Sequence, residues 1–367
     1  MDEPMKILIL TQTFPLTPQD STAHFMYDFA RGLAQIGEKV TVFLPYHPHL
    51  KPKLFQNVKI TSFKYIWPSP LHLLGFGRTL ENDQKLRWFV YLLAPFYFLF
   101  GTLALFLLVR KEKPDIINAH WILPGGFIAA IVSRLTGVRL FISLAGSDVY
   151  LARRNILFWQ MALFVKRQAT KLISNSPQLL SDFGARGEVI SYGVPVELNK
   201  KLPQAPRHQK TKFKKVLVAT AGRPVEKKGF ALLQRLIPGI EIVSDLPVGD
   251  FRKKLLEVDI FIALSLRDSK GNLDDSSLTV LEAMAAGCAV IASDFPGYRR
   301  IIQNGRNGLL VSPDDEVSIN NAVKTLRRSG NLRYCLGRKA RQTIAASFTP
   351  DKIAKKYRAI FSSSLSK

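Results

Sequence analysis

The sequence contains few cysteines and few acidic residues. Of 367 residues only Cys288 and Cys335 are cysteines, too few for a disulfide framework, which predicts a reducing, cytoplasmic location. We find no Cys and His spacing typical of a zinc site and no internal repeat. The first residues carry no cationic region before their apolar run, so we expect a first strand there and not a signal peptide.

The shortage of acidic residues leaves the chain strongly basic. There are 52 Lys and Arg against 28 Asp and Glu, a formal charge of +24. This balance favours an anionic partner: nucleic acid, acidic lipid headgroups or a phosphorylated substrate. Nucleic acid is disfavoured because no recognition motif and no basic sheet with interleaved aromatic residues is evident. The length and a hydrophobic content of 47% predict two well-packed domains.

The first half of the chain alternates strand and helix patterns. The apolar run 6–10, a helical pattern at 23–35 and a second strand at 39–45 form a βαβ unit, which implies a parallel sheet. We predict a Rossmann-like domain over 1–195. Its further strands are expected at 57–63, 115–120, 138–144, 171–175 and 188–194, and its further helices at 125–135, at 158–167 and from 177.

The second half repeats the alternation after a polar break. Residues 196–215 are rich in Pro, Lys and Gln, as in an interdomain linker. A second α/β domain is predicted over 216–346, and a C-terminal segment 347–367 is expected to pack as a helix across the domains. The strands of the second domain are expected at 216–222, 259–265, 288–293 and 307–313.

One uncharged apolar run stands out, at residues 88–109. Its 22 residues are enough to cross a bilayer, but a crossing would separate the strand at 115–120 from its own sheet. We therefore predict a helix that lies in or dips into one leaflet and is broken at Pro95 or Gly101. Phe96, Phe98 and Phe100 are expected to face lipid, and the aromatic segment 67–77 to extend the same surface. The alternative is a buried crossover helix.

Two loops of the second half suit an anionic, hydroxyl-rich ligand. In the first, Arg223 and Lys228 follow a glycine turn and can clamp a diphosphate. In the second, Asp274 precedes a helix that carries Glu282, and amides at that helix N-terminus can bind phosphate. The alternatives are a solvated basic turn and an ordinary βα unit in which Glu282 caps something locally.

Together these motifs resemble a known family. Gly-Arg-x4-Lys-Gly at 222–229, followed from Asp274 by acid-x7-Glu-Ala-Met-Ala-x-Gly-x-x-Val-Ile-Ala-Ser, is similar to the retaining nucleotide-sugar glycosyltransferases of family 4. Ala-His-Trp at 119–121, Gly-Ser-Asp at 146–148 and Asn-Gly-Leu-Leu-Val at 307–311 extend the resemblance over nearly the whole chain. It implies the GT-B fold, an α/β architecture with two Rossmann-like domains facing across a cleft.

The resemblance also implies roles for individual residues. Arg223 and Lys228 would be catalytic, binding the donor diphosphate and stabilising the leaving group. Glu282 would bind the nucleotide ribose and Asp274 the donor sugar. Other donor contacts would come from Ser277, Leu278 and Thr279. His120 and Asp148 would lie on the acceptor or sugar side.

The implied reaction is sugar transfer with retention, in which the leaving diphosphate serves as the base. It uses no cofactor and no metal, because the arginine and lysine offset the developing charge, and we do not expect Asp274 and Asp275 to form a metal site. The basic surface and the apolar run favour a lipid-linked or polysaccharide acceptor, an anionic membrane surface as partner, and a peripheral location on the inner face of the plasma membrane.

Three features depart from the family pattern. Ala145 stands where a histidine often precedes the glycine, and residues 19–22 lack a glycine pair common in the first loop. Residues 230–259 hold one helix, one strand and a second helix, so we expect a shortened second domain. These departures motivate an alternative function: a non-catalytic relative that binds a sugar nucleotide or a partner.

Overall fold

The chain forms two compact units, one of which is interrupted in sequence by the other. The computed structural model describes residues 3–20, 22–76, 80–82, 85–196, 216–244, 246–269, 271, 273, 274 and 276–365. The first unit combines Met1–Ser191 with Ile353–Lys367, and the second is Tyr192–Lys352. The predicted linker 196–215 lies outside the described residues apart from Val196.

The first unit is built on a parallel sheet. Its strand order, among the described residues, is β3-β2-β1-β6-β7-β8-β9, and each neighbouring pair is parallel. The bounds are β1 Lys6–Leu10, β2 Lys39–Pro45, β3 Lys59–Phe63, β6 Ile116–His120, β7 Arg139–Leu144, β8 Lys171–Ser174 and β9 Glu188–Val189. The strand predicted at 188–194 is thus only two residues long, at the edge of the sheet. A short antiparallel pair, β4 Leu80–Asn82 and β5 Lys85–Leu86, precedes α2.

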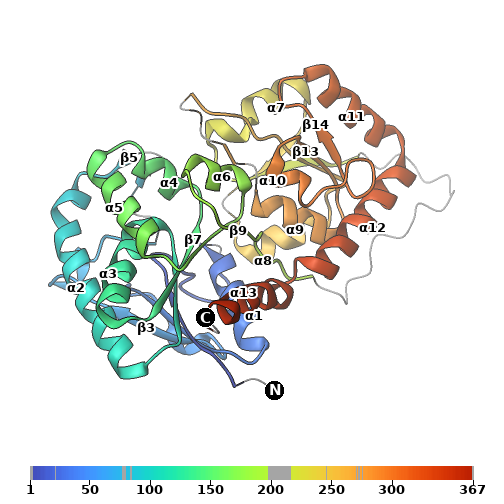
Figure 1. Cartoon of the computed structure of the whole chain (residues 1–367). Coiled ribbons are helices and arrows are strands. Elements are labelled where there is room, and N and C mark those ends of the chain that lie inside the picture. Colours follow the sequence, from blue (N-terminus) through green and yellow to red (C-terminus); the bar gives the residue numbers. More distant parts are fainter. Residues whose placement is uncertain are drawn as a thin grey trace. The chain divides into compact units, whose positions relative to one another are not determined.

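Helices cover the sheet because its strands are apolar on both faces. All five residues of β6 and four of the five in β1 are buried, the pattern of a parallel sheet with helical layers on each side. Figure 1 shows α2, α3 and α5 together beside this sheet and α1 with α13 near one another. The helices are α1 His24–Gln35, α2 Phe89–Glu112, α3 Phe127–Thr136, α4 Ser147–Ala152, α5 Ile156–Gln168, α6 Pro177–Asp182 and α13 Pro350–Leu365.

Helix α2 is continuous, so the predicted break at Pro95 or Gly101 is wrong. Pro95 lies in the second turn and deprives only the Tyr91 carbonyl of its helical donor. At Gly101 a Cβ atom would lie 2.9 Å from Cδ1 of Ile128 and 3.1 Å from Cε2 of Phe63. The glycine therefore permits close packing of α2 on α3 and β3.

The two faces of α2 differ in burial. Val90, Leu93, Tyr97, Gly101, Leu105, Leu108 and Val109 are buried. Phe98 is half-buried, with its ring centroid 5.6 Å from that of Phe127 on α3, so it is less exposed than predicted. Phe96 and Phe100 are exposed, as expected. In the segment 67–77, Trp67 and Leu71 are exposed but Leu74 and Phe76 are buried.

The second unit repeats the parallel architecture with a smaller sheet. Its order, in the described part, is β11-β10-β12-β13-β14. The strands are β10 Val218–Ala221, β11 Glu241–Val243, β12 Ile260–Ala263, β13 Ala289–Ser293 and β14 Leu309–Val311. The helices are α7 Phe230–Leu236, α8 Val248–Leu255, α9 Leu278–Ala286, α10 Pro296–Arg299, α11 Glu316–Arg328 and α12 Gly330–Ser347. Residues 230–259 hold α7, β11 and α8, the content that the sequence predicts.

Each sheet has one point at which the strand order reverses. In the first unit β2 and β6 flank β1, and in the second β11 and β12 flank β10. Loops at the carboxyl ends of such strands diverge and leave a crevice in which ligands of open α/β sheets bind. The two predicted loops of the second half follow β10 and β12, so both lie at the reversal point of the second sheet.

Candidate functional site

The loop after β10 is folded back by two glycines. Gly222 has a φ of 137° and Gly229 a φ of 61°, both in the region that favours glycine. A Cβ at Gly222 would lie 3.3 Å from Cε of Lys228, so the lysine side chain runs across the start of its own loop. A Cβ at Gly229 would lie 3.1 Å from the carbonyl oxygen of Leu264, which places this loop against the end of β12.

The loop after β12 is anchored through the backbone of Asp274. Oγ of Ser265 donates to the Asp274 carbonyl at 2.5 Å, and the hydroxyl of Tyr298 reaches the same oxygen at 3.3 Å. Ser293, at the end of β13, holds Ser265 in turn. Oγ of Ser293 accepts from the backbone N–H of Ser265 and donates to the Ser265 carbonyl oxygen. Asp274 therefore has a fixed position at the carboxyl edge of the second sheet.

The two loops meet at Lys228. Its Nζ lies 2.8 Å from Oδ2 of Asp274 and donates to Oγ of Ser277 at 3.1 Å. Oγ of Ser277 also lies 2.8 Å from Oγ1 of Thr279. The structure thus brings together Lys228, Asp274, Ser277 and Thr279, four of the residues selected from the sequence.

The electrostatics of the cluster favour an ionised carboxylate. Burial alone would raise the pKa of Asp274, but the cations of Lys228, Lys227 and Arg223 together hold that pKa below its ordinary value. Arg223 is exposed and contributes to this field. The Asp274 carboxylate therefore lies among several positive charges.

The N-terminus of α9 opens onto the same cluster. Ser277 is the residue before α9 and Leu278 begins it, but the Ser277 side chain makes no capping hydrogen bond. Its hydroxyl is directed to Lys228 and Thr279 instead. The first amides of α9 then present the positive end of the helix dipole, an arrangement suited to an anion.

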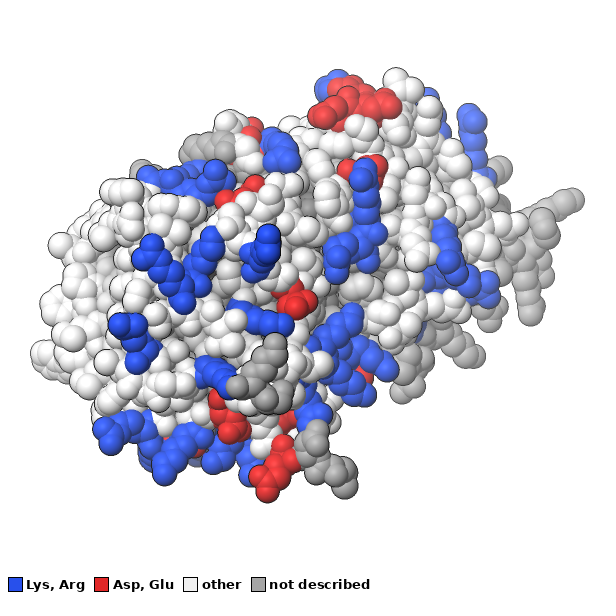
Figure 2. Space-filling model, viewed as in Figure 1, with Lys and Arg blue, Asp and Glu red and all other residues white. Residues whose placement is uncertain are grey.

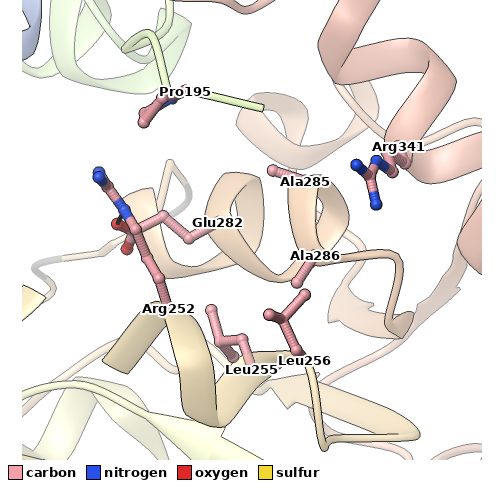
Figure 3. A pocket seen from close by; sticks show the side chains of 8 residues that line it. All are labelled: Pro195, Arg252, Leu255, Leu256, Glu282, Ala285, Ala286 and Arg341. Atoms are coloured by element: carbon pink, nitrogen blue, oxygen red, sulfur yellow. Dashed lines mark ion pairs between the residues drawn. The ribbon is translucent and has the colours of Figure 1, made fainter. Parts of the chain in front are cut away.

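Glu282 lies one turn further along α9, beside a cation from α8. Its side chain is 8% exposed, and its Oε1 lies 3.5 Å from Nε of Arg252. The pair borders a small cavity of about 40 Å³. Figure 3 shows the Arg252 side chain extending beside Glu282, with Leu255, Leu256 and Ala286 at the opposite end.

Several members of this site were missed from the sequence. Arg252 belongs to the run Arg-Lys-Lys at 252–254, in which nothing distinguishes it from its neighbours. Ser265 and Tyr298 act on Asp274 across distances of 9 and 24 residues. Only the tertiary structure brings these side chains to the site.

In the first unit, His120 is engaged within the core. It is 5% exposed, and its Nε2 lies 3.0 Å from Oδ1 of Asn118. Its ring packs edge-on to Phe29 at a centroid distance of 5.3 Å. Burial lowers the pKa of His120 to about 3, so its ring is neutral at physiological pH.

Asp148 organises two loops at the carboxyl edge of the first sheet. It is also 5% exposed, and it accepts hydrogen bonds from the backbone N–H groups of Ile122 at 2.8 Å, Gly146 at 2.9 Å and Ala145 at 3.3 Å. Burial raises the pKa of Asp148, against the lowering effect of backbone amides that include those of Ile122 and Ala145. Its contacts suit a residue that shapes the loops following β6 and β7.

The loop after β1 is held by an aspartate in place of the family's glycine pair. Asp20 accepts from the amides of Leu16 at 3.0 Å and Thr22 at 2.9 Å. Ser21 in this loop and Asp275 in the loop after β12 lie outside the described residues. Within the part of the chain that is described, no group of three or more His, Cys, Asp or Glu side chains is placed to hold a metal.

Comparison with known proteins agrees with this arrangement. A family described as "Glycosyl transferases group 1" matches residues 198–329, which include the whole cluster around Lys228. A family described as "Glycosyl transferase 4-like" matches residues 92–176, which include His120 and Asp148. The chain belongs to the group 1, family 4 glycosyltransferases.

Individual relatives of this group 1 glycosyltransferase are distant. An uncharacterized glycosyltransferase of Methanocaldococcus jannaschii is 32% identical over 115 residues, which cover 30% of this chain and only 28% of that protein. A putative teichuronic acid biosynthesis glycosyltransferase of Bacillus subtilis is 20% identical over 96% of both chains. The crystal structure of Anabaena HepE in complex with UDP superposes with a TM-score of 0.70 at 17% identity, over 98% of this chain and 100% of that one. The likeness establishes the GT-B type of fold, with two Rossmann-like domains.

Proposed function

We propose that the protein transfers a sugar from a nucleotide-diphosphate sugar, with retention of configuration, to a lipid-linked or polysaccharide acceptor. The observation that carries the proposal is the contact of Lys228 with Asp274 and Ser277 at the N-terminus of α9. This cluster combines a cation, a carboxylate and helix amides at the point of the sheet where ligands bind. Such a set matches a ligand that carries both phosphate and hydroxyl groups.

In this proposal the cations act on the leaving group. When the glycosidic bond to the diphosphate breaks, negative charge develops on the phosphate oxygens. Arg223 and Lys228 offset that charge, and the first amides of α9 add their dipole. A diphosphate that takes Lys228 away from Asp274 frees the carboxylate to accept hydrogen bonds from hydroxyls of the donor sugar.

Glu282 is assigned to the nucleotide ribose. A carboxylate accepts from two neighbouring hydroxyl groups, and Arg252 lies where it orients the Glu282 side chain. The complexes of Anabaena HepE with UDP and with UDP-glucose support a nucleotide sugar as donor. We assign no cofactor and no metal, because this chain supplies cations of its own at the diphosphate.

The acceptor side of the proposal rests on charge and on relatives. The leaving diphosphate would take the proton of the acceptor hydroxyl, so no separate base is required. The teichuronic acid relative supports an acceptor of the cell envelope. A net charge of +24 favours an anionic membrane surface, and we assign the protein to the inner, cytoplasmic face of the membrane.

A nucleotide panel tests the proposal. We expect UDP, GDP or ADP, and the matching nucleotide sugar, to raise the melting temperature of the protein. Arg223→Ala and Glu282→Ala should each abolish that stabilisation while the circular dichroism spectrum is unchanged. If none of the diphosphates binds, or if both variants bind as well as the wild type, the site is wrongly placed.

A second candidate is a relative that binds a sugar nucleotide without transferring the sugar. Ala145 supports it, because its methyl group offers no hydrogen bond where the family often has histidine. The two candidates differ in one measurement. Transferase activity predicts release of nucleoside diphosphate from the bound sugar nucleotide once an acceptor is supplied, whereas the second candidate predicts binding alone.

A further inference from the structure

One face of α2 exposes large apolar side chains along the whole helix. Eight residues, 41–74% exposed, form this α2 face: Trp88, Tyr91, Leu92, Phe96, Leu99, Phe100, Leu103 and Leu107. Most recur at intervals of three or four residues, so they lie in one stripe about 29 Å long. Contiguous apolar surface of this length on a folded protein marks an interaction site.

The opposite side of α2 is already used by the core. Phe98 on α2 packs against Phe127 on α3, and Phe127 packs against Phe164 on α5 at a centroid distance of 5.7 Å. Tyr97 packs against Tyr65 and Phe63. The helix is therefore fixed to its unit by one side, and the α2 face cannot turn inward without breaking these contacts.

Charge is arranged around the α2 face and not within it. Residues 88–109 carry no charged side chain. Arg87 precedes them, and Arg110, Lys111 and Lys113 follow, all exposed. The acid that ends α2, Glu112, is paired with Lys59. In Figure 2 the left edge of the molecule, where Figure 1 places α2, shows neither acidic nor basic side chains, and blue side chains lie further along the same unit.

The topology excludes a bilayer crossing. By length and composition alone α2 could span a membrane. However, β3 before it and β6 after it belong to one sheet, joined through β2 and β1. Both ends of α2 must therefore stay on the same side of the bilayer, with the helix axis along its surface.

We propose that the α2 face is the surface by which this protein docks on an anionic lipid leaflet, with α2 lying in the plane of the interface. Its apolar stripe enters the boundary between headgroups and acyl chains, and the cations at both helix ends meet anionic headgroups. The Arg87 guanidinium at one end and Arg110, Lys111 and Lys113 at the other fit a negatively charged surface, which argues for lipid over a second, equally basic copy of this chain. The proposal specifies the membrane location given above but rests on α2, not on the donor site.

Vesicle cosedimentation tests the docking surface. The wild type should bind vesicles of phosphatidylglycerol and phosphatidylcholine in equal parts. The triple variant Leu92→Ser, Phe96→Ser, Leu99→Ser should bind about 100-fold more weakly. Replacing Arg110, Lys111 and Lys113 by Gln should weaken binding about 100-fold on these vesicles and hardly at all on pure phosphatidylcholine.

The matched control removes exposed apolar side chains elsewhere. Leu54 and Val317 are 48% and 67% exposed, and Leu54→Ser with Val317→Ser should bind vesicles like the wild type. The circular dichroism spectrum and the urea midpoint report whether each variant is folded. Nucleotide affinity, measured in parallel, tests the donor site in the second unit, and its absence from the wild type would contradict that site without touching this proposal. The proposal is overturned if the triple variant binds normally, if neutral vesicles bind the wild type equally well, or if the wild type is a dimer that the triple variant dissociates.

The depth of α2 gives a second test. Trp88 lies at the start of the α2 face and Leu107 at its end. Trp121 and Trp159 are kept in every variant, and their emission, measured in Trp67→Phe, Trp88→Phe, is subtracted. In the Trp67→Phe background, brominated lipids should then quench Trp88 at a shallow depth. In the variant Trp67→Phe, Trp88→Phe, Leu107→Trp, the new tryptophan should be quenched at the same depth. Quenching of one position near the bilayer centre and the other at the surface would overturn the in-plane orientation.

Discussion

Nζ of Lys228 lies 2.8 Å from Oδ2 of Asp274, so the lysine assigned to the donor diphosphate is already paired within the chain. Lys228 also donates to Ser277. A diphosphate carries more negative charge than one carboxylate, so it can displace Asp274 from the lysine. In the proposed function, the pair would thereby couple phosphate binding to the release of the carboxylate that we assign to the sugar.

The first prediction concerns the charge of Lys228. Lys228→Ala should weaken binding of the cognate nucleoside diphosphate about 10- to 100-fold, because a charge-assisted hydrogen bond is lost and Asp274 then repels the phosphates. Isothermal titration calorimetry measures the change. Lys253→Ala, which removes the same charge from an exposed position on α8, should bind like the wild type. Equal losses in both variants would indicate a general effect of net charge.

The second prediction concerns acid stability. Cations hold the pKa of Asp274 below its ordinary value against the effect of burial, so the carboxylate stabilises the folded state above the pKa of the unfolded chain, about 4. This contribution is lost as the pH falls through the folded-state pKa. Between about pH 6 and about pH 3, the free energy of unfolding in urea should therefore fall more for the wild type than for Asp274→Asn. Parallel curves for the two proteins would contradict the role of the cations.

The third prediction separates two roles for Arg252. If Arg252 acts by orienting Glu282, Arg252→Ala should weaken binding of the ribonucleoside diphosphate about 10-fold but have little effect on the 2′,3′-dideoxy form. The dideoxy ligand lacks the ribose hydroxyls that we assign to Glu282, so misplacing the Glu282 carboxylate costs it no affinity. The same loss with both ligands would instead mean that Arg252 contacts the phosphates or the base.

The fourth prediction concerns the packing of α12 against α9. A Cβ at Gly337 would lie 2.0 Å from the carbonyl oxygen of Gly287, at the end of α9, whereas a Cβ at Gly249 on α8 meets nothing within 4 Å. Gly337→Ala should lower the free energy of unfolding by about 2 kcal/mol or more, since backbone must shift. Gly249→Ala should raise it by about 0.5 kcal/mol through helix propensity. Urea titration followed by circular dichroism compares the two, and an unchanged midpoint for Gly337→Ala would contradict the close approach.

The alternation of strands and helices was predictable because parallel strands that are buried on both faces appear in the sequence as nearly continuous apolar runs. The runs at 6–10 and 115–120 correspond to β1 and β6 within one residue. The meeting of the loops after β10 and β12 was predictable too, because glycine turns, cations and a helix N-terminus stand close together in the sequence of each loop. Lys228, Asp274, Ser277 and Thr279 meet for that reason.

Other features depend on which elements pack together, and local patterns do not encode that. Pro95 and Gly101 signal a helix break when read alone, yet the packing of α2 on Ile128 and Phe63 keeps the helix continuous through both. The pairing of Arg252 with Glu282 requires that α8 lie beside α9. Asp148 accepts hydrogen bonds from backbone amides of two separate loops, which no local pattern encodes.

Helix α13 determines when the first unit can be completed during synthesis. Phe361 is fully buried, with its ring 4.7 Å from that of Phe141 on β7, and Tyr357 packs on Phe29 of α1. On the ribosome, the first sheet emerges early but its core stays open to water until residues 353–365 have been translated. The second unit, continuous from 192 to 352, has all of its strands before then. The nascent chain is therefore expected to finish its second half first, with the apolar surface that α13 later covers exposed to chaperones in the interval.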